Sequence, residues 1–217
     1  MDHDDRRRLA FAVGLTTIAG YVDAVGFLQV GHLFVSFMSG DSTQLAVSAA
    51  RANWSGMGEA GGAVALFVIG VIAGRILTRA MKHRYRTAVL LTEAALLALA
   101  VLLQTTGTVV IVPMVLAMGI QNAVLHKVGD VKTSLTYVTG TLVNLGEKFA
   151  DSFGTPDPKQ RWAWVPYLLL WLGLIVGAVL GATLYGTLRL SALFIPAAVL
   201  MVLAAVTSTT QGYETVT

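Results

Sequence analysis

One polar sequence pattern occurs twice in this chain, about a hundred residues apart. The first copy reads Gly-Tyr-Val-Asp-Ala at residues 20–24 and Ser-Phe-Met-Ser-Gly-Asp-Ser-Thr-Gln-Leu at residues 36–45. The second copy reads Gly-Ile-Gln-Asn-Ala at residues 119–123 and Thr-Tyr-Val-Thr-Gly-Thr-Leu-Val-Asn-Leu at residues 136–145. In both copies, small and polar residues interrupt runs that are otherwise apolar. A repeat constrains the fold strongly, because each copy is expected to form the same structural unit.

The composition indicates the medium in which these repeats fold. Of the 217 residues, 55% are hydrophobic and 12% are charged, whereas soluble domains average about 25% charged residues. The mean hydropathy is +0.71. Such a chain cannot cover a globular surface with polar groups, so we expect an all-α protein that crosses the membrane several times. The chain has no cysteine, which excludes disulfides and thiolate chemistry.

Eight apolar segments divide evenly between two repeats within a single membrane domain, residues 1–217. The first repeat, residues 9–105, contains segments at 9–30, 33–50, 58–79 and 87–105. The second repeat, residues 109–206, contains segments at 109–125, 133–150, 162–188 and 191–206. We expect the first segment to be a retained span and not a cleaved signal.

Positive charge predicts which segments cross, because Lys and Arg collect on the cytoplasmic side. If all eight segments cross, the basic residues divide seven against eight. If segments 33–50 and 133–150 instead enter and leave on the same side, thirteen of fifteen lie inside, and only Arg51 and Arg189 lie outside. The sequence therefore predicts six transmembrane helices plus two re-entrant or broken half-helices, with both termini cytoplasmic.

Three crossings per repeat give the two repeats opposite orientations in the membrane. Inverted repeats with interrupted helices recur in transporters and channels, whose solute site lies at the midplane between the repeats. We expect the breaks at Ser39-Gly40 and Thr139-Gly140, each followed by a short helix with Asp41 or Thr141 near its N-cap.

These motifs resemble a known family. Gly-Tyr-Val-Asp-Ala at residues 20–24, Ser-Gly-Asp at residues 39–41 and Tyr-Val-Thr-Gly-Thr-Leu at residues 137–142 are similar to the YoaK-like proteins, bacterial multi-pass inner-membrane proteins whose domain is classed as of unknown function. The resemblance covers roughly residues 9–206 and implies a bacterial inner-membrane location. The family more often has Thr-Gly-Asn where this chain has Ser-Gly-Asp, so Asp41 places a carboxylate where a neutral amide is usual.

The candidate solute-binding residues are the polar and glycine positions of the two copies. They are Asp23, Ser39, Gly40, Asp41, Gln44, Gln121, Asn122, Thr139, Gly140, Thr141 and Asn144.

Each of these side chains also has a structural interpretation. An ionisable group such as Asp23 in mid-membrane costs at least about 2.5 kcal/mol and needs a partner, water or a proton. It is either a solute or proton site or a hydrogen-bond acceptor for the broken backbone of residues 33–50. Asp41, at the expected break, is the stronger candidate, and its structural alternative is an N-cap. Amides such as Gln44 and Asn144 suit neutral polar solutes, and they also join helices to one another.

Two further features are expected to be structural. Glycine stripes at residues 70/74 and 173/177/181 let helix backbones approach closely, and we expect them to pack the two third segments together. A homodimer through these faces is the alternative. Glu93 lies in an apolar segment with no acidic counterpart in the second repeat, and we expect it to pair with a Lys or Arg.

The predicted function is passage of a small polar or ionic solute, by a carrier or a channel, with proton coupling as one mode. The alternative is a non-transport scaffold or sensory partner with a structural polar core. No His and carboxylate spacing suggests a metal, and no nucleotide or hydrolase motif is present, so neither a cofactor nor an enzymatic activity is expected. The net charge of +3 reports orientation in the membrane and not nucleic-acid binding.

Overall fold

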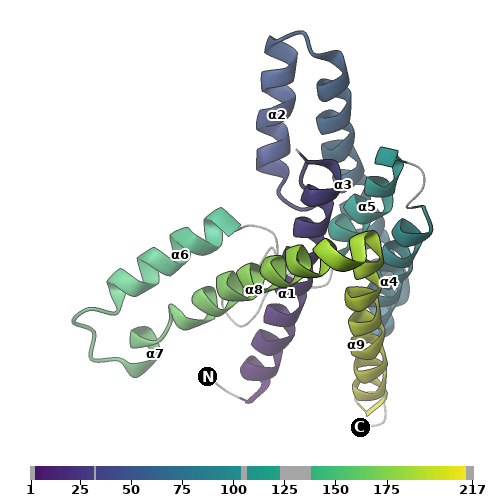
Figure 1. Ribbon diagram of the computed structural model, residues 1–217. Helices are drawn as coiled ribbons and strands as arrows, with labels where there is room; N and C mark the ends of the chain where they lie inside the picture. Colours follow the sequence, from purple (N-terminus) through teal and green to yellow (C-terminus); the bar gives the residue numbers. More distant parts are fainter. Residues whose placement is uncertain (1–2, 32, 104–106, 123–137, 214–217) are drawn as a thin grey trace.

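The structure is a computed structural model that describes residues 3–31, 33–103, 107–122 and 138–213. Every regular element in those ranges is helical (Figure 1). The helices are α1 (His3–Val30), α2 (Met38–Ala50), α3 (Trp54–Met81), α4 (Tyr85–Leu102), α5 (Ile111–Gln121), α6 (Val138–Asp151), α7 (Pro158–Arg161), α8 (Val165–Leu188) and α9 (Phe194–Tyr213). Short 3₁₀ turns lie at η1 (Lys82–Arg84), η2 (Gly107–Val110) and η3 (Arg189–Leu193).

Four helical stretches are long and apolar enough to cross a bilayer. They are Asp4–Val30, Trp54–Met81, Tyr85–Leu102 and Val165–Ser208. The last stretch has 44 residues, more than twice the roughly 20 that one crossing needs, and it turns at Arg189, whose φ is +52°. Helix α5 is shorter, with 11 residues, and equally apolar. The chain is therefore a multi-pass membrane protein.

Helices that occupy equivalent positions in the two repeats make several equivalent contacts. The first helix of each repeat packs against the third segment of the other, as α1 with α8 and α5 with α3. The fourth helices, α4 and α9, pack against each other. The second helices lie outside, α2 on α3 and α6 on α8. Exchanging the two repeats therefore maps these contacts onto one another, whereas the packing of α4 on α5 and on α3 has no equally extensive counterpart in α9.

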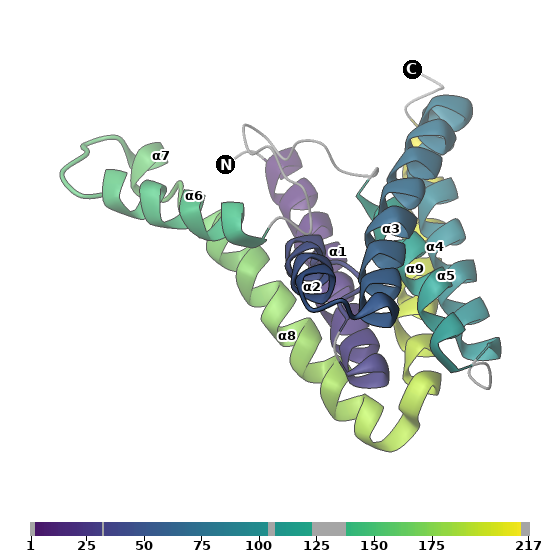
Figure 2. The same ribbon diagram turned by 90° about the horizontal axis from the view of Figure 1, so that it is seen from above.

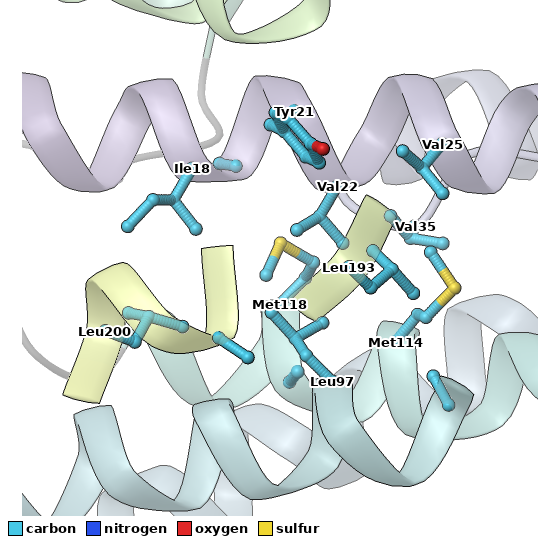
Figure 3. Packing of buried hydrophobic residues seen from close by; sticks show 14 of the residues in the cluster. Ile18, Tyr21, Val22, Val25, Val35, Leu97, Met114, Met118, Leu193 and Leu200 are labelled. Carbon is cyan, nitrogen blue, oxygen red and sulfur yellow. The ribbon is translucent and has the colours of Figure 1, made fainter. Parts of the chain in front are cut away.

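The buried core lies where α1, α4, α5 and η3 meet (Figure 3). Val22 and Val25 of α1 point toward Met114 and Met118 of α5, and Leu193 of η3 lies between these helices. Most other large apolar side chains of the long helices are exposed, for example Ile69, Ile72 and Val202. An apolar exterior around a small core is what lipid surroundings require.

Glycines set the closest helix crossings. Glycines on successive turns of α8 lie against successive turns of α1: Gly173 at Val13, Gly177 at Thr17 and Gly181 at Tyr21. Because the residue numbers of α1 increase along the contact in the same order as those of α8, the two helices run in the same direction. In the matched crossing, Gly70 of α3 lies against Gly119 and the carbonyl of Leu116 in α5. The predicted packing of the two third segments against each other is therefore wrong. The glycines of α8 instead pack against α1, and Gly70 of α3 packs against α5. A face of small residues allows any neighbouring helix backbone to approach closely, so the stripe does not specify its partner.

The ends of the helices fall on two sides of the molecule. The hydroxyl groups of Thr87, early in α4, and Thr207, late in α9, lie 3.3 Å apart, so these helices are antiparallel. Figure 2 shows the first turn of α1, the last turns of α9 and the α6–α7 pair at one end, and the η3 turn at the other. Helices α2 and α6 do not follow the direction of the long helices in that view.

The expected helix breaks at Ser39-Gly40 and Thr139-Gly140 are wrong. Helix α2 begins at Met38, and the amide of Gly40 donates to the carbonyl of Phe37, 3.0 Å away, so Ser39 and Gly40 belong to its first turn. Helix α6 begins at Val138 and contains Thr139 and Gly140. Backbone inside a membrane gains more from helical hydrogen bonds than a serine or glycine loses by weak helix propensity.

Candidate functional site

The described break in the first repeat is the segment of residues 33–37, between α1 and α2. Helix α1 ends before Gly31, whose φ of +82° is a conformation that glycine adopts readily. Phe37 is the N-cap residue of α2 and makes no side-chain capping hydrogen bond. The amide groups of this segment consequently need acceptors from elsewhere in the chain.

Two aspartates from neighbouring helices supply those acceptors. Oδ1 of Asp23, in α1, accepts hydrogen bonds from the amides of Val35 at 2.8 Å and Ser36 at 2.9 Å. Oδ1 of Asp41, in α2, accepts from the amide of Phe34 at 3.1 Å. Asp41 is fully buried, at 0% exposure, and Asp23 is half-buried. The structure thus brings the two predicted acidic residues together on one non-helical segment.

The hydrogen bonds of Asp23 show that the chain folds back beside α1. Asp23 lies seven residues before Val30, the last residue of α1, which corresponds to about 10 Å along the helix axis. Val35 and Ser36 reach Asp23, so the segment returns by about two helical turns after α1 ends. The structural interaction considered for Asp23, with the broken backbone before α2, is therefore present.

Aromatic rings cover the segment. Phe27 stacks on Phe34 with ring centroids 4.9 Å apart, and Phe34 meets Phe37 edge to face at 5.4 Å. A Cβ atom at Gly40 would lie 2.8 Å from the ring of Phe37. The absence of a Cβ at Gly40 therefore leaves room for the Phe37 ring to pack against the backbone of α2.

The amide pair of the second repeat lies at the end of α5. The Nε2 group of Gln121 donates to the carbonyl of Leu15, in α1, at 3.2 Å, and Gln121 is fully buried. Asn122 donates to the carbonyl of Met118, one turn earlier in its own helix, at 2.8 Å. Gln121 thus joins α5 to α1, the helix that also carries Asp23.

The remaining candidates of the second repeat lie on α6, away from this cluster. Thr139 is exposed, Gly140 is buried, and Asn144 donates to the carbonyl of Gly140 at 2.7 Å. Helix α6 packs on α8 and α7, and Figure 1 shows it on a different arm of the molecule from α2. In this arrangement Thr141 and the other α6 candidates do not share a site with Asp41.

The first repeat also places Ser39 and Gln44 along α2, exposed and half-buried respectively. Several positions of the motifs fall outside the described residues: Ala123, Thr136 and Tyr137, together with His126, Lys127 and Lys132. Within the described ranges, no three His, Cys, Asp or Glu side chains gather as a metal site would require.

Glu93 differs from the expectation of an ion pair. Its side chain is fully buried in α4, and neither carboxylate oxygen has a hydrogen-bond partner among the described residues. The sequence signal that could have identified Glu93 as a functional candidate is its position as a single acidic residue inside an apolar span, since such residues are rare in membranes and usually functional.

Comparison with known proteins places these features in a family. Residues 11–206 match the family described as "Protein of unknown function (DUF1275)". The UPF0700 transmembrane protein RA0705 of Rhizobium meliloti (strain 1021) is 32% identical over 204 residues, covering 91% of this chain and 84% of that protein. The UPF0700 transmembrane protein YoaK of Bacillus subtilis (strain 168) is 30% identical over 142 residues, covering 61% of this chain and 63% of that protein. No solved structure matches.

Proposed function

Because this chain belongs to the YoaK-like (DUF1275) family of transmembrane proteins, whose description gives no activity, we propose from its own geometry that it carries a small polar or ionic solute across the membrane. The observation that supports this most directly is the convergence of Asp23 and Asp41 on residues 34–36. Ionisable groups at membrane depth usually mark solute or ion pathways. Interrupted helices provide the binding groups in many transporters.

The proposed architecture has six crossing helices, α1, α3, α4, α5, α8 and α9, and two that do not cross, α2 and α6. The return of the chain toward Asp23 after α1 supports a re-entrant second segment. The parallel α1–α8 pair and the antiparallel α4–α9 pair agree with three crossings per repeat. Two repeats of three crossings are inverted relative to each other, and the exchange of contacts between α1–α8 and α5–α3 supports that symmetry.

The chemistry of the site favours a cationic or protonated solute. The first-repeat residues offer two carboxylates, whereas the α6 candidates, which lie apart from them in this arrangement, offer the hydroxyl groups of Thr139 and Thr141 and the amide of Asn144. An acidic end attracts a cation or proton, and a neutral end accommodates a polar group. The protein would lie in the bacterial inner membrane with both termini in the cytoplasm, and its role would not be enzymatic.

The two ends form one site only if α6 approaches α2, which defines a first test. Ser39 and Thr139 are both exposed, and the chain has no cysteine, so the double variant Ser39→Cys/Thr139→Cys reports their proximity. We expect a bifunctional maleimide to join these cysteines within one chain during turnover. Absence of intramolecular cross-linking under every solute and pH condition would remove the α6 residues from the site.

A second candidate function is a membrane scaffold or sensory partner with a structural polar core. It is favoured by the hydrogen bonds of Asp23 and Asp41, which go to backbone amides of this chain. A scaffold needs no wet path to these carboxylates, whereas a carrier or channel does.

Electrical recording from reconstituted vesicles separates the two functions. We expect pulses of monovalent cations or small primary amines to evoke saturable currents that depend on the protein and on pH. Asp41→Asn keeps an acceptor for the amide of Phe34 and should leave the protein folded while it changes ion coupling or solute choice. Asp151→Asn, at an exposed aspartate of α6, is the matched control. A folded wild-type protein that gives no current with any solute favours the scaffold, and unchanged pH dependence in Asp41→Asn would restrict Asp41 to a structural role.

A further inference from the structure

Glu93 lies at the centre of the membrane-spanning helix α4. It is eight residues after Tyr85 and nine residues before Leu102, the ends of α4, so it lies about 12–14 Å from either end of the helix. The helix is one of the four candidate spans. In the proposed topology α4 crosses the bilayer, which would place Glu93 close to the middle of the hydrocarbon layer and far from both aqueous phases.

The face of α4 that contains Glu93 is closed by apolar packing. The neighbours of Glu93 one turn away, Val89, Leu90 and Leu97, are each 0% exposed. Leu97 points toward Met118 of α5 and Leu193 of η3 (Figure 3). Both oxygens of Glu93 are buried and accept no hydrogen bond from any described residue. An ionised carboxylate in such surroundings is strongly disfavoured relative to the neutral acid.

No titratable group of the packed elements compensates for its charge within the described residues. Helix α5 contains no titratable side chain, and neither does α9 between Phe194 and Ser208. The basic side chains on α3, η1 and η3 are exposed and near the helix ends: Arg75, Arg79, Lys82, Arg84 and Arg189. Glu59 lies in the first turns of α3, and Tyr85 and Arg86 lie in the first turn of α4. None forms a hydrogen bond with Glu93.

We propose that Glu93 is a proton-binding site of this protein, occupied when α4 is packed against α5 and α9 as it is in this structure. The O–H bond of the neutral carboxylic acid breaks when these helices separate and water enters, and the proton passes to that water. The carboxylate that remains takes up a proton from the other side before the helices close again. This inference rests on the proposed transport function and assigns its coupled ion, since Glu93 is distinct from the acidic pair at residues 23 and 41.

The geometry makes the proton the expected ligand and not a metal cation. A metal ion needs several oxygen ligands around it, whereas the buried residues one turn from Glu93 on α4 are aliphatic and no cluster of metal-ligating side chains occurs among the described residues. A proton needs a single carboxylate oxygen and leaves a neutral group that the apolar packing tolerates. Alternating protonation is also how buried carboxylates act in many pumps and transporters.

Infrared difference spectroscopy on the full-length protein in lipid tests protonation without any transport assay. We expect the wild-type protein to show the carbonyl stretch of a neutral carboxylic acid near neutral pH, and we expect Glu93→Gln to lose that band. Glu147→Gln, at an exposed glutamate of α6, should retain it. A spectrum with no such band above acidic pH, or a band of unchanged intensity in folded Glu93→Gln, overturns the assignment.

Current measurements then test coupling. The solute current of the wild-type protein should rise and fall with pH, and Glu93→Gln should abolish this dependence while it retains thermal stability. If the solute currents of the wild-type protein and of Glu93→Gln depend on pH in the same way, the coupling role is wrong. If the wild-type protein gives no solute current but the infrared band titrates and requires Glu93, the proton site stands and the transport function fails.

Discussion

At the scale of single residues, the carboxylate of Asp23 holds the backbone that precedes α2. It accepts from the amides of Val35 and Ser36, whose residues are 0% and 5% exposed. Asp23→Ala leaves both amides without this acceptor and should lower the free energy of unfolding by about 3 kcal/mol. Asp23→Asn keeps an acceptor oxygen and should cost about 1 kcal/mol. Thermal unfolding in detergent measures both, with Asp151→Ala as the exposed control; equal stability of Asp23→Ala and Asp23→Asn would show that the hydrogen bonds contribute little.

At the scale of helices, the glycine stripe of α8 determines how closely α1 can approach. A Cβ at Gly177 would collide with the carbonyl of Thr17, whereas a Cβ at Gly186, on the same helix, meets nothing within 4 Å. Gly177→Ala should therefore destabilise the protein by at least about 2 kcal/mol. Gly186→Ala should have no effect or should stabilise it by up to about 1 kcal/mol, because alanine favours helix. Equal unfolding temperatures of the two variants would contradict the α1–α8 contact.

The same reasoning applies to the matched crossing of α3 and α5. A Cβ at Gly70 would lie 2.6 Å from the carbonyl oxygen of Leu116, and a Cβ at Gly62 of α3 meets nothing within 4 Å. We expect Gly70→Ala to lower the unfolding temperature and Gly62→Ala to leave it unchanged or raise it. A stable Gly70→Ala variant would mean that the two crossings are not equivalent.

At the scale of the whole molecule, the proposed topology fixes which helix ends face each aqueous phase. Single cysteines at the exposed positions Ser55, Ala80 and Thr187 report the two ends of α3 and the end of α8. In intact cells, a membrane-impermeant maleimide should label Ser55→Cys and Thr187→Cys, and it should label Ala80→Cys only after permeabilisation. Eight crossings would reverse the results for Ser55 and Ala80 and would disprove the inverted arrangement.

Composition and motifs alone establish the environment, the family and several positions of close helix contact. Low charge and high hydropathy require a lipid exterior, whatever the topology. The motifs around Asp23 and Asp41 identified the YoaK-like family, and they also marked two side chains that meet at one chain break. Glycines 70 and 177 were evident as members of small-residue stripes in apolar runs, because only a missing Cβ allows backbones to touch.

The partners of each helix face and the exact chain break depend on how the helices pack, which periodicity and composition do not encode. A glycine stripe defines a face but not its partner, so the pairing of α8 with α1 depended on which helix fills the space beside it. The break before α2 lies at residues 33–37 and not at Ser39-Gly40, because the carboxylate of Asp23, ten or more residues earlier, satisfies the amides that a helix would otherwise pair. Glu93 looked like half of an ion pair in the sequence. Only the packing of α4 showed that both of its oxygens are buried without a hydrogen-bond partner among the described residues, since burial is a property of all the surrounding helices together.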